Sequence, residues 1–312
     1  MQHRFLFIGH GTISKAYIKA IAKMEHAHVV GVVGRTAERA AAFAAEHDIE
    51  VHGTNIADTV SRARATAAVI CTPNALHDEG VLEASRLGLH CLCEKPLHID
   101  PQRQQAMLDS CKQHGVKLGV SYMRRFLPHI RYIKDVLDQG LLGEIQVMDV
   151  IIKHYRPKSY YDSWHGTINM DGGGPFIQQG SHIIDMALWL SGGYLDIYDA
   201  KRFKVYHKEI ETEDHGYAIV RYGNNAIGMI EASTGCRGIS KDMIEISGTK
   251  GSIVADYEKI HLFDVEGLTE PDFSQEDVSI DRMFTLLVQD FIAAIEEDRE
   301  LFINGASAAL AT

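Results

Sequence analysis

The chain has 312 residues, more than one hydrophobic core usually serves, and this length predicts two domains. Its formal net charge of -11 argues against nucleic-acid phosphates and anionic membrane surfaces as partners. The composition, 46% hydrophobic and 23% charged, excludes a disordered chain, and no apolar run has the length of a membrane helix. Five cysteines without paired spacing and an N-terminal apolar run too short for a signal peptide predict a cytoplasmic protein with reduced thiols.

The first part of the chain alternates short apolar strands with helical patterns. Strands are expected at 4–9, 28–34, 66–72, 90–94 and 116–121, with helices between most of them. Continuous apolar strands separated by helices are typical of a parallel sheet covered on both faces. The sequence therefore predicts a doubly wound α/β domain, a Rossmann dinucleotide-binding domain, over residues 1–122.

After residue 122 longer strand patterns follow one another. They lie at 144–155, 198–207, 215–223, 226–233 and 242–248, and a helix is expected at 284–298. Strands joined by turns predict an open, mostly antiparallel sheet, so residues 123–312 are expected to form an α+β domain for substrate binding and oligomerisation. The chain stops at "NGASAALAT", where a last helix is expected to be cut short.

A glycine turn follows the first strand directly. Gly9 and Gly11 lead into a helix, as in a dinucleotide-binding turn whose backbone N–H groups meet a pyrophosphate. Ser14 stands where that pattern has its third glycine, and a small residue there keeps close helix packing possible. Thr12 and Ile13 open the helix, and both are assigned to the cofactor site with the two glycines.

The end of the second strand bears on the choice of nicotinamide cofactor. An NAD-selective site carries Asp or Glu there for the ribose 2'-hydroxyl, but this chain has Gly34, followed by Arg35 and Thr36. Arg35 suits a 2'-phosphate, which favours NADP over NAD, with Thr36 beside it. The alternative is that Arg35 is a solvated surface residue.

Three motifs carry a resemblance to a known family. "VICTPNALHDEG", "HCLCEKPLHID" and the three glycines ahead of His182 and Asp185 resemble the glucose-fructose oxidoreductase, inositol dehydrogenase and rhizopine-catabolism family, Gfo/Idh/MocA. The similarity runs from residue 4 to about residue 310. It implies an NAD(P)-dependent oxidoreductase that transfers a hydride between nicotinamide and a secondary alcohol or ketone of a sugar, sugar derivative or cyclic polyol.

The resemblance also assigns residues near the cofactor. Lys95 is the catalytic cation and also contacts cofactor and substrate, Glu94 and Pro96 shape its turn, and the Lys95–Pro96 peptide is expected to be cis. Further cofactor contacts are expected from Thr72, Pro73, Asn74, His77, Glu94 and Trp164. For His77 the alternative is an exposed polar residue in the first turn of a helix.

Residues 172–190 are apolar except for a few polar groups. If a helix begins near Pro175, then Gln178, His182, Asp185 and Trp189 share one face, and this stripe is expected to line a cavity. The family has Asp at the position of Gln178, which as an amide accepts no proton. We assign His182 as proton shuttle with Lys95, Gln178 as substrate-orienting group and Asp185 as acceptor for a substrate hydroxyl. Alternatively, His182 and Asp185 form a buried pair without chemistry.

The segment 153–167 is rich in aromatic and basic residues that suit a sugar or an anionic group. Tyr155 is assigned to substrate binding, and Trp164 matches a family position although His165 replaces the arginine beside it. Arg124 and Arg125 either face the substrate or cap the next helix. No metal site is apparent in the sequence, and the family needs none.

Two other functions remain open at this point. One is a non-catalytic sugar or dinucleotide sensor on the same fold, and the other is a trans-dihydrodiol or carbonyl reductase. The open sheet of the second domain predicts a homo-oligomer, dimer or tetramer, built face to face as in the family.

Overall fold

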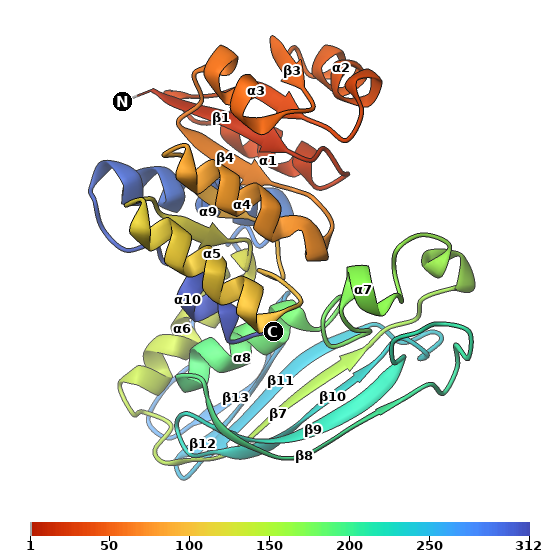
Figure 1. Ribbon diagram of the computed structural model, residues 1–312. Coiled ribbons are helices and arrows are strands. Elements are labelled where there is room, and N and C mark those ends of the chain that lie inside the picture. Colours follow the sequence, from red (N-terminus) through yellow and green to blue (C-terminus); the bar gives the residue numbers. More distant parts are fainter. Residues whose placement is uncertain (1) are drawn as a thin grey trace. The chain divides into compact units, whose positions relative to one another are not determined.

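The computed structural model describes residues 2–312 and divides into two compact units (Figure 1). Among these residues, the first comprises 2–123, Ser279–Leu310 and Thr312, and the second comprises Arg124–Val278 and Ala311. Each unit has its own sheet, so the predicted fold class, a Rossmann domain with an α+β domain, is confirmed. No helix among residues 2–312 is long and apolar enough to cross a membrane.

The first unit contains a parallel sheet with the order β3-β2-β1-β4-β5-β6. Its strands are β1 His3–Ile8, β2 Ala27–Val33, β3 Val51–Gly53, β4 Ala67–Ile70, β5 His90–Cys93 and β6 Leu118–Val120. The sequence pattern did not indicate β3, which has three residues and is only half-buried. The order reverses between β1 and β4, and ligands of such sheets bind at the carboxyl ends of the strands near this point.

Helices cover both faces of this sheet. They are α1 Ser14–Ile21, α2 Ala37–Glu46, α3 Ile56–Ala63, α4 His77–Arg86, α5 Pro101–Gln113, α9 Ile280–Glu296 and α10 Gly305–Ala309. Figure 1 shows α4 and α5 side by side in front of the sheet, and α9 packs against α1. Phe291 of α9 lies against Phe5 of β1, with ring centroids 6.1 Å apart.

The last part of the chain belongs to the first unit, which differs from the predicted boundary. The sequence placed all of 123–312 in the second domain, but 279–310 packs with the Rossmann sheet. Apolar residues on one side of α9 explain this arrangement, because Met283, Phe284, Leu287 and Val288 are buried against the first unit's core.

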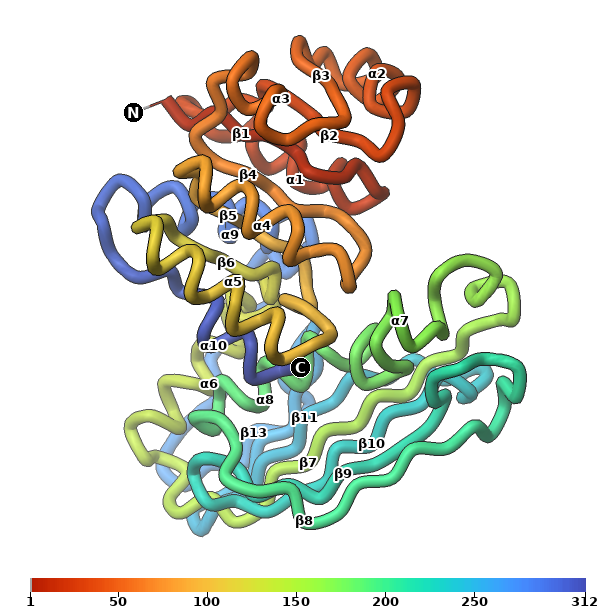
Figure 2. The backbone as a smooth tube through the Cα atoms, in the orientation of Figure 1, coloured from red at the N-terminus to blue at the C-terminus, as the bar shows by residue number. Residues whose placement is uncertain are grey.

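The second unit is built on one seven-stranded sheet with the order β13-β12-β11-β7-β10-β9-β8, which Figure 2 shows as a continuous twisted layer. Its strands are β7 Ile145–Lys153, β8 Tyr194–Phe203, β9 His215–Tyr222, β10 Ile227–Ser233, β11 Lys241–Gly248, β12 Gly251–Ala255 and β13 Ile260–Val265. Only β7 and β10 run parallel, and the other neighbouring strands are antiparallel.

The two faces of this sheet differ in burial. The helices of the unit are α6 Pro128–Asp138, α7 Ile168–Asp171 and α8 Ser181–Ser191. Val150 and Ile152 of β7 and Ile244 of β11 are buried on the face against which α8 packs. On the opposite face Val147 and Met229 remain exposed, as expected for alternation along a strand.

Candidate active site

The glycine turn of the first unit has the geometry of a dinucleotide-binding loop. Gly9 has φ +84°, and a Cβ there would lie 2.8 Å from the carbonyl carbon of Cys71. Ser14, in the position of the third glycine, is buried and its Oγ donates to the Gly11 carbonyl at 2.6 Å. Within residues 2–312 the structure gives the N–H groups of Gly11, Thr12 and Ile13 no acceptor. These exposed donors at a helix start fit a pyrophosphate.

A basic cavity lies beside this turn. It has a volume of about 320 Å³ and is lined by His10, Gly11, Thr12, Lys15, Arg39, Ala42, Phe43 and Glu46. His10 stacks on Phe43, and a Cβ on Gly34 would lie 2.8 Å from the His10 Nε2 atom. A side chain at position 34 would therefore require the His10 ring to move. Sequence reasoning identified Arg35 but missed His10, Lys15 and Arg39. The cavity depends on tertiary contacts, the His10–Phe43 stack and the Lys15–Glu46 ion pair.

The predicted Lys95–Pro96 cis peptide is present at the end of β5. Below it Glu94 is buried, accepts a hydrogen bond from Tyr17 Oη at 2.7 Å and another from the Lys95 N–H at 3.2 Å. Burial raises the pKa of Glu94, and the hydrogen bond from Tyr17 opposes that shift. Glu94 thus supports the turn that carries Lys95.

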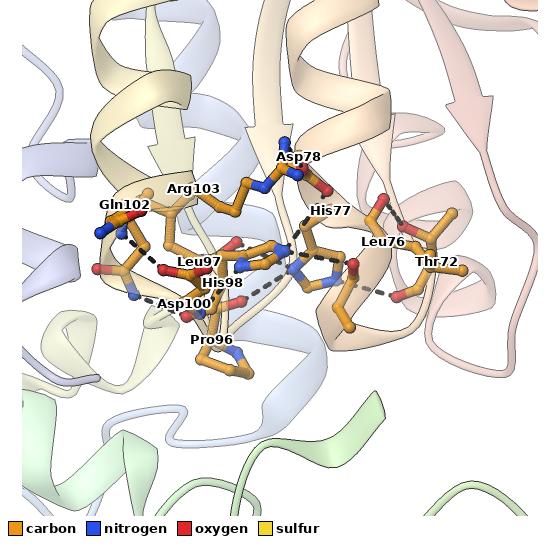
Figure 3. Close-up of polar contacts among 12 residues, drawn as sticks. Thr72, Leu76, His77, Asp78, Pro96, Leu97, His98, Asp100, Gln102 and Arg103 are labelled. Carbon is orange, nitrogen blue, oxygen red and sulfur yellow. Dashed lines mark hydrogen bonds and ion pairs between the residues drawn. The ribbon is translucent and has the colours of Figure 1, made fainter. Parts of the chain in front are cut away.

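His77 connects two loops of the first unit through contacts of its ring nitrogens (Figure 3). Its Nδ1 lies 2.8 Å from the Pro96 carbonyl oxygen, and its Nε2 lies 2.9 Å from the Thr72 carbonyl oxygen. The ring is 1% exposed, which contradicts both its expected cofactor contact and an exposed surface position. Thr72 itself donates its hydroxyl to the Leu76 carbonyl at 3.1 Å, while Pro73 is half-buried and Asn74 buried. His77 therefore links the lysine turn to the loop after β4.

The glycines before α8 allow the backbone to approach a neighbouring segment closely. A Cβ on Gly174 would lie 1.8 Å from the Glu213 carbonyl oxygen, and the Gly174 N–H donates to the Glu213 carboxylate at 2.8 Å. Helix α8 begins at Ser181 and not near Pro175, since residues 175–180 form turns. Gln178 consequently lies ahead of the helix, and the expected single face with His182 is wrong.

Asp185 forms an ion pair with Arg125 and does not line a cavity as expected. The guanidinium donates from Nε to Oδ2 at 2.7 Å and from Nη2 to Oδ1 at 2.5 Å, with both side chains buried. Burial raises the pKa of Asp185 to about 6, against the opposing pull of Arg125. The predicted role of Asp185 as a substrate acceptor is corrected to a structural ion pair, and Arg125 anchors α8.

The other predicted residues of the second unit are half-buried. His182 lies in the first turn of α8, and Gln178 Nε2 donates to Asp171 Oδ1. Tyr155 lies with its hydroxyl 3.2 Å from that of Tyr206. The rings of Trp164 and His165 are in contact, with centroids 4.0 Å apart. Sequence reasoning missed Asp171, because an acidic residue just before three glycines reads as a turn residue.

Arg124, which was left open beside Arg125, lies over the ring of Tyr257 at 4.5 Å from its centroid. Tyr257 is half-buried, and desolvation of its hydroxyl raises its pKa well above the usual range. Arg124 therefore packs within the second unit. Within residues 2–312 no three His, Cys, Asp or Glu side chains are arranged to hold a metal ion.

Comparison with known families agrees with this geometry. Residues 3–122 match the family described as "Oxidoreductase family, NAD-binding Rossmann fold", and residues 130–254 match the "GFO/IDH/MocA C-terminal domain". The chain belongs to the Gfo/Idh/MocA family. It is a nicotinamide-dependent oxidoreductase with a Rossmann domain of the NAD-binding type.

Several relatives match over most of the chain. Inositol 2-dehydrogenase of Rhizobium meliloti is 28% identical over 98% of this chain and 92% of its own length. The oxidoreductase YrbE of Bacillus subtilis is 27% identical over 80% of this chain and 72% of its own length. Among solved structures, the WlbA dehydrogenase of Bordetella pertussis with NADH and UDP-GlcNAcA is 27% identical, with a TM-score of 0.89 over 100% of this chain and 93% of its own.

Proposed function

We propose that this Gfo/Idh/MocA protein transfers a hydride between a nicotinamide cofactor and a secondary alcohol or ketone carbon of a sugar, sugar derivative or cyclic polyol. The observation that carries the proposal is the turn after β5, where buried Glu94 and Tyr17 support Lys95 at the carboxyl edge of a dinucleotide-binding sheet. Inositol 2-dehydrogenase among the relatives supports a polyol or sugar as the substrate class.

Each residue has a chemical task in this proposal. A bound nicotinamide supplies the hydride acceptor when the alcohol is oxidised. The hydride leaves the carbon, and the hydroxyl proton passes to His182 as general base, so that the products are a ketone and a protonated histidine. The Lys95 ammonium stabilises the negative charge that develops on the oxygen. Gln178 orients the reacting hydroxyl, and Tyr155 and Trp164 offer aromatic surfaces to the sugar.

Activity of the Lys95→Ala and His182→Ala variants tests these roles. A screen with inositols, free sugars, UDP-GlcNAcA and trans-dihydrodiols identifies a substrate, and each variant is expected to lower kcat by roughly 100-fold or more. Thermal unfolding of the variants is the control. Full turnover in His182→Ala together with a lower melting temperature would assign His182 to structure alone, and absence of turnover with every substrate would favour a sensor.

We also propose that NADP is the preferred cofactor. Arg35 is exposed, and Gly34 occupies the position at which an NAD-selective site carries a carboxylate. His10, Lys15 and Arg39 add basic groups in the adjoining cavity. Titration of nicotinamide fluorescence with NADPH and NADH is expected to give tighter NADPH binding, and Arg35→Ala should weaken NADPH by roughly tenfold while sparing NADH. Equal affinities for the two cofactors in wild type would count against the preference.

The open face of the second sheet supports assembly into a homo-oligomer, dimer or tetramer. Val147, Ile227 and Met229 are exposed on neighbouring strands β7 and β10. Apolar surface of this kind favours a second copy of the same face, related by twofold symmetry. A cytoplasmic location is also proposed, because all five cysteines are free thiols and four of them are buried.

A further inference from the structure

Asp171 is a buried carboxylate that the proposed reaction has not used. It ends the short helix α7 and is 1% exposed. The Gly166 N–H donates to its Oδ2 at 2.6 Å, Gln178 Nε2 donates to its Oδ1, and the His165 Nδ1 lies 3.9 Å from Oδ2. A buried carboxylate is costly unless donors surround it, and here Gly166 and Gln178 of the same unit supply hydrogen bonds.

The contact with Asp171 determines which way the Gln178 amide faces. A carboxylate only accepts, so the NH2 group of Gln178 must point to Asp171. The carbonyl oxygen Oε1 is the other amide atom and therefore faces away from the carboxylate. Gln178 thereby presents an acceptor oxygen four residues ahead of His182 in the sequence, as an aspartate at position 178 would, but without a titratable group.

We propose that Asp171 is a positioning residue that acts through Gln178, and that it holds the amide so that Oε1 accepts a hydrogen bond from the reacting substrate hydroxyl. The inference rests on the proposed sugar or polyol oxidoreductase function. No proton moves to Gln178 or Asp171, since the hydroxyl proton passes to His182 and the hydride to the nicotinamide. The negative charge stays on Asp171, one hydrogen bond behind the amide.

His165 belongs to the same cluster. Its ring stacks on Tyr160 with a centroid distance of 4.2 Å and an angle of 9°, so that both neighbours fix its plane. The carboxylate of Asp171 lies at its Nδ1 side. Asp171 therefore lies between the segment that carries Trp164 and the turn that carries Gln178. Its carboxylate contacts both segments, through His165 and through Gln178.

Exchange of the two side chains tests the proposal. Asp171→Asn permits either amide of the pair to flip, and kcat is expected to fall roughly 10- to 100-fold with a smaller change in KM. Gln178→Asp alone brings two carboxylates together, so one holds a proton at neutral pH and activity is also low. The double variant, Asp171→Asn with Gln178→Asp, again has one carboxylate and one amide. Its kcat should be higher than that of Asp171→Asn by roughly tenfold or more.

The pH profile provides a readout that a purely structural role of Asp171 would not change. The carboxylate introduced by Gln178→Asp faces the substrate in the double variant, so the acid side of the kcat/KM profile is expected to depend on two titrating groups, where wild type has only the general base His182. Should Asp171→Asn alone fail to fold, the double variant carries the test, with thermal unfolding and NADPH fluorescence as controls. A folded double variant without recovery overturns the proposal.

The outcomes separate this inference from the function on which it rests. Wild-type turnover with undiminished kcat in Asp171→Asn overturns the positioning role alone. Absence of wild-type turnover with any sugar or polyol overturns the proposed function, and the positioning role with it. A low kcat in Asp171→Asn that the double variant restores supports both.

Discussion

At the residue scale, burial decides the roles of the polar side chains that the sequence singled out. His77, Glu94 and Asp185 are all buried, and each is held by partners in its own unit. Removing one partner of a buried pair leaves an unpaired polar group, which is costly, so the contacts of these residues hold the surrounding segments in place. Lys95, His182 and Gln178 are only half-buried and remain the candidates for chemistry.

His77 makes stability depend on pH. Burial lowers its pKa to about 4, although the carbonyl oxygens of Pro96, Thr72 and Leu97 favour the charged ring and oppose the shift. Because the unfolded chain takes up this proton near pH 6.5 and the folded chain does not, lowering the pH from about 6.5 to about 4 is expected to reduce the free energy of unfolding by up to about 3 kcal/mol. Above about pH 6.5 the contribution is constant.

Urea unfolding across this pH range checks the prediction. The difference between wild type and His77→Gln isolates the contribution of this ring from other titrating groups. His26→Gln, at an exposed histidine, serves as the matched control. Parallel pH dependence in wild type and His77→Gln would contradict the prediction.

At the element scale, the turns at the carboxyl edge of the Rossmann sheet set the cofactor site. The strands β1, β2, β4 and β5 are neighbours and parallel, so the segments that follow them emerge at one edge. These segments carry Gly9 to Ile13, Arg35, Thr72 and Lys95. Strand order thus brings together residues that are up to a quarter of the chain apart.

Two glycines of the same turn are predicted to respond differently to alanine. Gly9→Ala meets the backbone of Cys71 and an unfavourable φ, and it should lower the free energy of unfolding by about 1 to 3 kcal/mol. Gly11→Ala has only the Cys71 carbonyl oxygen within reach, at 3.8 Å, and should change stability by less than about 0.5 kcal/mol. Its methyl group faces the expected pyrophosphate, so NADPH affinity should fall roughly tenfold.

Urea unfolding and nicotinamide fluorescence measured on both variants separate the two effects. Unchanged NADPH affinity in a well-folded Gly11→Ala variant would argue that the dinucleotide does not approach this backbone. Equal stability of both variants would contradict the packing argument for Gly9.

At the scale of the whole molecule, the second sheet covers one face with α8 and leaves the other open. Gly228 on this sheet has no room for a side chain, since a Cβ would lie 1.8 Å from the Met148 carbonyl oxygen, so the strands are tightly paired. All ten residues of the edge strand β8 are exposed. An open apolar face beside an exposed edge strand favours association with another copy of the chain.

A charge on this face is expected to dissociate the homo-oligomer. Met229→Lys should lower the mass in multi-angle light scattering from that of a dimer or tetramer toward that of a monomer, because a lysine would be buried without a partner in the interface. Leu87→Lys, at a residue of similar exposure in the first unit, is the matched control. A monomeric wild type at micromolar concentration would contradict the assembly.

The cis Lys95–Pro96 peptide was expected from the family resemblance. The sequence by itself determined the two-domain organisation, the parallel and mixed sheets and the glycine turn. These features follow from local patterns of strand, helix and turn residues, which a single stretch of chain carries. The sequence pattern did not predict the short strands β3 and β12 or the start of α8 at Ser181. Such short elements depend on their neighbours for stability. Only the tertiary structure decided that Asp185 pairs with Arg125, that His77 ties two loops and that Asp171 holds Gln178. Partners distant in sequence are chosen by burial, and burial exists only once the chain has folded.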